Sequence, residues 1–130
     1  MSLRVLIVDD NAYFLDAARD LLDREGMAVV GVASNGADAM RGADELKADV
    51  ILVDIDLGGE SGIDLTRALT EGRGDRQQSV ILMSAYPEEE FGDLIDESPA
   101  IAFLSKSHLS AQAIRDIVGP IVDRGDREEG

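Results

Sequence analysis

Five short apolar segments recur along this chain, and each is followed by a longer stretch whose apolar residues have helical spacing. The apolar segments are residues 5–8, 28–32, 50–53, 80–83 and 101–104. Most are rich in β-branched residues and nearly continuous, which is typical of strands buried on both faces of a parallel sheet. A regular alternation of strand and helix places helices on both faces through right-handed crossovers. The sequence therefore predicts an α/β fold with a doubly wound, five-stranded parallel sheet.

The stretches between the strands predict five helices, and several have clear start or stop signals. We expect them over residues 13–24, 37–46 and 63–69, then from Pro87 onward, and over residues 110–118. Asn11 is suited to cap the first helix and Gly26 to end it. Apolar residues spaced three or four apart would form the inner face of that helix, namely Phe14, Leu15, Ala18, Leu21 and Leu22.

Size and charge exclude several classes of function. A length of 130 residues suits one domain, which we place at residues 1–122, with 123–130 as a charged tail or linker. The chain has 27 acidic and 12 basic residues, a formal charge of −15, which disfavours binding to nucleic acid or to anionic membranes. Cysteine is absent, and no apolar run approaches the roughly 20 residues needed to span a bilayer. We expect a cytoplasmic protein that neither enters a membrane nor itself contacts DNA.

Polar residues follow the predicted strands at the edge where open parallel sheets bind their ligands. Asp9 and Asp10 follow the first strand and Asp54 the third, while Ser84 and Lys106 follow the fourth and fifth. Carboxylates brought together in this way repel one another unless a cation intervenes. Mg²⁺ accepts carboxylates, water and phosphate as ligands. The set therefore predicts a phosphoryl group held between Mg²⁺, an ammonium and a hydroxyl, with a carboxylate as the nucleophile.

Four motifs in this order resemble the receiver domain of bacterial two-component response regulators. They are residues 5–10 (VLIVDD), 53–57 (VDIDL, followed by Gly62), 83–85 (MSA) and 103–106 (FLSK). The similarity extends over about residues 3–122. It implies a flavodoxin-like (βα)5 fold with strand order 2-1-3-4-5, and a signalling function rather than an enzymatic one.

The resemblance also implies a role for each matching residue. Asp54 would be the phosphoacceptor, and Mg²⁺ would be held by Asp9, Asp10, Asp54 and the backbone carbonyl of Asp56. Lys106 would contact the phosphoryl oxygens, and Ser84 would move to donate a hydrogen bond to them. Phe103 would turn inward as Ser84 moves and reshape the surface of the fourth helix, fifth strand and fifth helix, although Phe103 is equally well explained as a core residue.

Three positions depart from the family pattern. Gly58 stands where the family often has proline, so the loop after the acceptor has more freedom. Ser107 replaces the proline that usually follows the lysine, which makes the orientation of Lys106 the weakest part of the comparison. Asp56 adds an acid near the phosphoryl group, and we hypothesise that it alters the lifetime of the aspartyl phosphate.

The partners implied are a sensor histidine kinase and, through the same switch surface, a second copy of the chain. Residues 104–107 (LSKS) resemble receivers that precede LuxR-type helix-turn-helix domains, so we expect transcriptional output to lie in a domain outside this sequence. A stand-alone receiver that acts by protein binding is the alternative. A less favoured alternative is an Mg²⁺-dependent phosphohydrolase, because Asp54 and Asp56 have the Asp-x-Asp spacing of haloacid-dehalogenase-like phosphatases.

Overall fold

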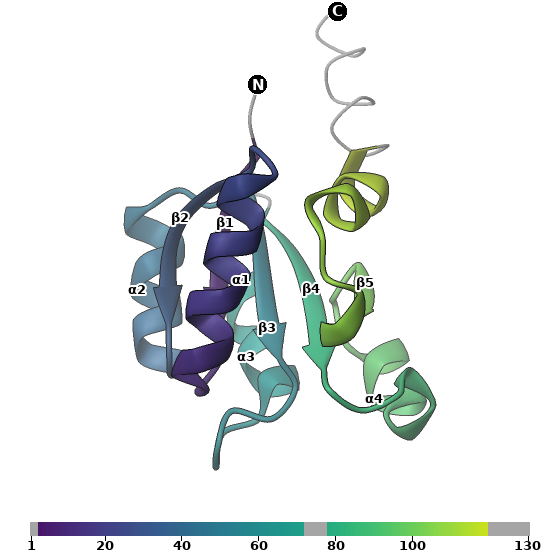
Figure 1. The fold of residues 1–130 in the computed structure, drawn as a ribbon. Helices are drawn as coiled ribbons and strands as arrows, with labels where there is room; N and C mark the ends of the chain where they lie inside the picture. Colours follow the sequence, from purple (N-terminus) through teal and green to yellow (C-terminus); the bar gives the residue numbers. More distant parts are fainter. Residues whose placement is uncertain (1–2, 72–77, 120–130) are drawn as a thin grey trace, which may run out of the picture.

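The protein is built around five parallel strands in the order β2-β1-β3-β4-β5 (Figure 1). The structure is a computed structural model that describes residues 3–71 and 78–119. The strands are β1 (Arg4–Val8), β2 (Ala28–Ala33), β3 (Val50–Asp54), β4 (Ser79–Ser84) and β5 (Ala102–Ser105). Each neighbouring pair is hydrogen-bonded in parallel. The predicted fold class and strand order are confirmed.

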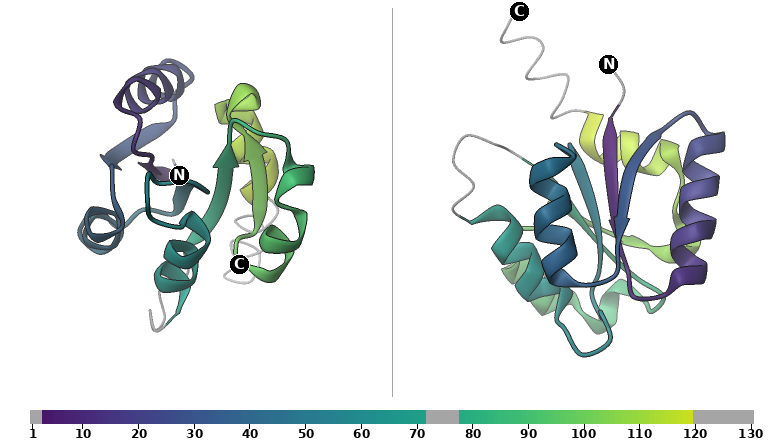
Figure 2. Two further views of the ribbon diagram at one scale, coloured as in Figure 1. Left: turned by 90° about the horizontal axis from the view of Figure 1, so that it is seen from below. Right: turned by 90° about the vertical axis from the view of Figure 1, so that its left-hand side faces the viewer.

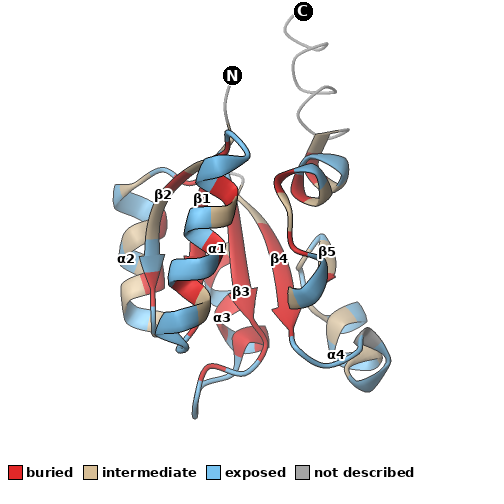
Figure 3. Cartoon of the chain, in the orientation of Figure 1, coloured by how far each residue is buried: buried red, intermediate tan, exposed pale blue. Residues whose placement is uncertain are grey.

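Burial on both faces explains the nearly continuous apolar strands. Alternate residues of β1 enter different cores: Val5 and Ile7 pack on one side of the sheet, and Leu6 and Val8 on the other. β3 repeats this alternation, and the apolar residues of both strands are at most 1 % exposed (Figure 3). A strand with two buried faces cannot alternate apolar and polar residues.

Helices cover both faces of the sheet (Figure 2). One face packs against α1 (Ala12–Arg24) and a C-terminal helix described over residues 111–119. The other packs against α2 (Gly36–Glu45), α3 (Gly62–Thr70) and side chains in and beside the short α4 (Gly92–Glu97). Side-chain caps begin three of them: Asn11 accepts from the backbone amides of Tyr13 and Phe14 in α1, and Asn35 and Ser61 cap α2 and α3. These caps satisfy amides that have no partner inside the helix.

The fourth helix differs from the prediction that it begins at Pro87. Residues Glu88–Glu90 form a single 3₁₀ turn, and α4 begins only at Gly92. The first side chains of this region to reach the core are those of Phe91 and Ile95. Because short helices are stabilised mainly by packing, the acidic run does not form α-helix in spite of its proline. None of the residues of α4 is fully buried.

The remaining boundaries differ from the predictions by one or two residues. Lys106 lies just beyond β5, in a 3₁₀ turn over Lys106–His108. Ser110 precedes the C-terminal helix and accepts a hydrogen bond from the amide of Ala113. The predicted tail at 123–130 lies outside the described residues. Within the described part of the chain, no helix is long and apolar enough to cross a membrane.

Candidate functional site

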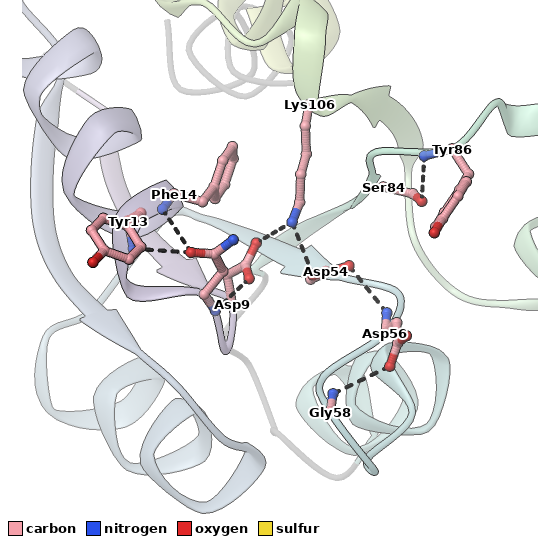
Figure 4. A network of polar contacts seen from close by, with 10 residues as sticks. Asp9, Tyr13, Phe14, Asp54, Asp56, Gly58, Ser84, Tyr86 and Lys106 are labelled. Carbon is pink, nitrogen blue, oxygen red and sulfur yellow. Dashed lines mark hydrogen bonds and ion pairs between the residues drawn. The ribbon is translucent and has the colours of Figure 1, made fainter.

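The ends of β1, β3 and β4, and the turn after β5, meet at a cleft of about 450 Å³ (Figure 4). The structure brings together the residues predicted for the site. The residues that line the cleft include Asp9, Asp10, Asp54, Ser84 and Lys106. Carboxylate oxygens of the three aspartates lie within 4.8 Å of one another. The cleft is therefore rich in oxygen ligands and lies at the carboxyl edge of the sheet, where such folds bind their ligands.

Asp9 is fully buried at the end of β1. Its Oδ1 accepts a hydrogen bond from the amide of Asn11 at 2.9 Å. Its Oδ2 lies 2.5 Å from Lys106 Nζ and accepts no hydrogen bond from any other described residue. A buried carboxylate is costly unless it is paired. Asp9 therefore depends on a cation, and Lys106 provides one.

Asp54 ends β3 and shares the same ammonium. Its Oδ2 accepts a hydrogen bond from Lys106 Nζ at 3.0 Å, and its Oδ1 accepts one from the amide of Asp56 at 3.1 Å. The Lys106 side chain is only 16 % exposed. One ammonium thus faces two carboxylates from different strands, although no proline follows Lys106 in the sequence. Its contact with the phosphoryl oxygens, implied by the family resemblance, remains a prediction.

The pKa values of both charged partners, Asp54 and Lys106, are raised above their ordinary values. Burial raises the pKa of Asp54 above its ordinary value and nearby Asp9 adds to this, although the hydrogen bonds from Lys106 and from the Asp56 amide act in the opposite direction. The pKa of Lys106 is also raised, because Asp9 and Asp54 together outweigh the effect of burial. Lys106 therefore stays positively charged across the neutral range.

The raised pKa of Asp54 predicts a pH-dependent stability difference. A carboxyl with a raised pKa in the folded state stabilises the fold below its ordinary pKa, and this contribution is lost as pH rises through the raised pKa. We therefore expect Asp54→Asn to be more stable than the wild type at neutral pH, with the two converging as the carboxyl becomes protonated. Urea unfolding over a pH series measures this. A difference that is constant with pH would contradict it.

The loop after Asp54 places two further groups at the cleft. Gly58 has a φ of +57°, and its amide donates to Asp56 Oδ1 at 3.2 Å. A Cβ on Gly58 would overlap Asp10 Oδ2. Proline could adopt neither this φ nor this hydrogen bond, so glycine here reflects a turn in which Gly58 and Gly59 both have positive φ.

Ser84 and Phe103 occupy different surroundings. Ser84 ends β4 with 4 % of its surface exposed, and its Oγ accepts a hydrogen bond from the amide of Tyr86 at 3.0 Å. The hydroxyl proton is thus available for another acceptor. Phe103 is half-buried against the core on the α4 side and lines a separate groove there with Ile95. Its predicted turn remains a prediction.

The donor set fits Mg²⁺. The three clustered carboxylates offer the hard oxygen ligands that this ion prefers, and two of them, those of Asp9 and Asp54, are buried. A single ammonium, that of Lys106, is paired with this cluster among the described residues. Further positive charge would relieve the repulsion between the carboxylates.

Comparison with known proteins agrees with this geometry. A family model described as the response regulator receiver domain matches residues 5–118. The chain belongs to this family. It is thus a receiver domain of two-component signalling, a class of module that is typically not enzymatic. The phosphohydrolase alternative is not favoured.

Individual relatives differ in length from this chain. A Thermotoga maritima protein-glutamate methylesterase/protein-glutamine glutaminase is 35% identical over 82% of this chain and 31% of its own length. The response regulator GacA of Pseudomonas aeruginosa is 33% identical over 88% of this chain and 55% of its own. A LuxR-family two-component response regulator from an Aurantimonas species superposes with a TM-score of 0.79 at 25% identity, covering 95% of this chain and 87% of that one. The chain therefore spans about a third to about half the length of the first two.

Two contributors to the site, Phe14 and Gly62, were given no role in it by the sequence analysis, although Gly62 belongs to one of the four motifs. The ring of Phe14 lies 4.4 Å from Lys106 Nζ, measured to the ring centroid. Gly62 allows the start of α3 to approach the backbone of Asp54 closely. Phe14 was assigned only to the inner face of its helix.

Proposed function

We propose that Asp54 accepts a phosphoryl group from a sensor histidine kinase and that this chain is the switch of a response regulator. The observation that supports this most directly is the shared ammonium: Lys106 Nζ lies 2.5 Å from Asp9 and 3.0 Å from Asp54. A positive charge next to the nucleophile is what an incoming dianionic group requires. The clustered carboxylates alone would repel this dianionic group.

In the proposed reaction, an ionised carboxylate oxygen of Asp54 attacks phosphorus in line with the donor. A new oxygen–phosphorus bond forms, the bond from phosphorus to the donor breaks, and its electron pair leaves with the donor. Lys106 offsets charge on the phosphoryl oxygens, and the Ser84 hydroxyl donates a hydrogen bond to one of them. Asp9, Asp10, Asp54 and the Asp56 carbonyl would hold Mg²⁺, which supplies further positive charge when bound.

The remaining roles are proposals of the same kind. Phe103 would respond to movement of Ser84 and alter the face formed by α4, β5 and the C-terminal helix, through which a second copy of the chain would bind. The receiver unit would comprise residues 1–122, of which 1–2, 72–77 and 120–122 lie outside the described residues. Output would come from a DNA-binding domain of a longer LuxR-type regulator, with a stand-alone receiver as the alternative. A cytoplasmic location accords with such a role.

Labelling with acetyl phosphate and Mg²⁺, followed by intact-mass measurement, tests this function. We expect each chain to gain one phosphoryl group, and the gain to disappear when EDTA removes the metal. Excess p-nitrophenyl phosphate serves as a control, because a receiver modifies itself once whereas a phosphatase turns over. No gain of mass, or sustained turnover of the ester, would contradict the proposal.

Asp56 is expected to shorten the lifetime of the aspartyl phosphate. Asp56 lines the cleft beside Asp54, and its exposed carboxylate, which already accepts from the Gly58 amide, can accept a further hydrogen bond from an attacking water. We expect Asp56→Asn to lengthen the half-life roughly threefold to tenfold, because an amide is a much weaker base. The asparagine carbonyl can still accept from Gly58, so the loop should persist. Phosphoryl loss is followed by intact mass after removal of the donor, with Asp16→Asn on the exposed side of α1 as a control. An unchanged half-life would reject this role.

A further inference from the structure

The backbone of Lys106 does not by itself fix the position of its side-chain ammonium. It begins a 3₁₀ turn whose preceding residue, Ser105, makes no side-chain cap. The next residues, Ser107 and His108, are exposed. A lysine side chain has four flexible carbons and loses considerable rotamer entropy when it is held in one place. The position of Nζ must therefore be set by what the side chain touches.

Lys106 Nζ contacts three side chains. Two of them are the carboxylates of Asp9 and Asp54, and the third is the ring of Phe14, whose centroid lies 4.4 Å from Nζ. This distance is well within the range of a cation–π interaction. An ammonium has three donors, so a ring beside two carboxylates completes its surroundings. Figure 4 shows the ring of Phe14 beside the end of the lysine side chain.

The ring itself is held in place. Phe14 is half-buried and packs against the core that α1 and the C-terminal helix share. Phe14 also lies in the first turn of α1, whose start is capped by Asn11. The aromatic face is thus anchored by packing and capping that do not involve Lys106.

Phosphorylation would change the contacts of Lys106 with Asp9 and Asp54 but not its contact with the Phe14 ring. On the proposed function, esterification converts the Asp54 carboxylate into an acyl phosphate, and bound Mg²⁺ competes for the oxygens of Asp9. Both ionic partners of Lys106 therefore change, whereas the ring does not. We propose that Phe14 is a positioning residue that holds the Lys106 ammonium at the phosphoryl site through its aromatic face. This inference rests on the proposed function.

The test replaces the ring without emptying its place. Phe14→Leu keeps apolar bulk but removes the aromatic face, and Phe14→Tyr keeps both. Trifluorophenylalanine at position 14 keeps the shape of the ring and weakens its attraction for cations. Tyr13→Leu is the matched control, because Tyr13 is the neighbouring aromatic on the same helix and is 89 % exposed. All variants are made in the full 130-residue chain.

Two readouts separate positioning from packing. In NMR spectra of the unphosphorylated chain, the ε-methylene protons of Lys106 should have a ring-current shift that Phe14→Leu abolishes and Phe14→Tyr retains. The initial rate of labelling by acetyl phosphate should fall roughly threefold to tenfold in the leucine and trifluoro variants. It should stay near the wild-type value in Phe14→Tyr and Tyr13→Leu. The thermal midpoint of the trifluoro variant should match that of the wild type.

The proposal would be overturned by an unaltered Lys106 shift in Phe14→Leu, or by wild-type labelling in the trifluoro variant. A fall in rate that follows thermal stability across the variants would assign Phe14 to packing alone and would also overturn it. Failure of the proposed function is recognised separately, because the wild-type chain would then take up no phosphoryl group while its ring-current shift, which needs no donor, remained.

Discussion

Replacement of Asp54 by asparagine should leave the chain unable to take up a phosphoryl group from acetyl phosphate, whereas the wild type gains one. The amide is a poor nucleophile and carries no charge, while the geometry of the side chain is nearly unchanged. The Asp56 amide can still donate to the side-chain oxygen of the introduced asparagine, so the loop has no reason to move. We therefore expect a complete loss of labelling by intact mass, without a loss of folded structure.

Asp56→Asn is the matched control for this loss, since it removes a charge from the same cleft but not the proposed nucleophile. It should still acquire one phosphoryl group, and peptide mapping should place that group on Asp54. Circular dichroism and urea unfolding verify that Asp54→Asn is folded. Labelling of Asp54→Asn at a wild-type rate would show that another residue accepts the phosphoryl group.

The strands of this fold were predictable because their sequence pattern reflects burial directly. Both faces of β1 and β3 are covered, so a continuous apolar run can represent little else in a chain with so regular an alternation. The fourth helix was predicted less well for the opposite reason. Pro87 and the acids after it are favourable helix-starting residues, but this preference is weaker than packing, and the packing residues Phe91 and Ile95 come later.

The candidate site, like the fold, was predicted well in some parts and less well in others. Asp9, Asp54 and Ser84 could be brought together from sequence alone, because each lies at or just beyond the end of a strand and parallel strands end at one edge. Lys106 could be placed at the same edge, but its contacts with Asp9, Asp54 and the Phe14 ring could not, since these partners are distant in sequence. The positive φ of Gly58 belongs to a local turn, in which Gly58 and Gly59 both have positive φ between the mutually hydrogen-bonded Leu57 and Glu60, and the Gly-Gly pair was a usable signal for it.

Gly62→Ala should have the largest effect on stability of the changes considered. Gly62 begins α3, and its amide donates to the carbonyl of Ile55 at 2.7 Å. A Cβ here would overlap the carbonyl oxygen of Asp54 and lie 2.8 Å from the Cα of Ile55. Both are backbone atoms and cannot move aside by rotating a side chain. We expect a loss of about 3 kcal/mol in the free energy of unfolding, measured with urea.

Gly92→Ala provides a matched control at the start of another helix. A Cβ at Gly92 would meet no atom within 4 Å, so alanine should leave stability unchanged or raise it by up to about 1 kcal/mol through its helix propensity. Relief of the overlap at Gly62 requires α3 or the end of β3 to shift, and a shift of β3 displaces Asp54 relative to Lys106. Gly62→Ala should therefore also label more slowly with acetyl phosphate, under conditions where it is still folded. Equal stability of the two variants would show that α3 does not approach the Asp54 backbone as closely as described, and a destabilised variant with wild-type labelling would show that the strain is relieved by α3 alone.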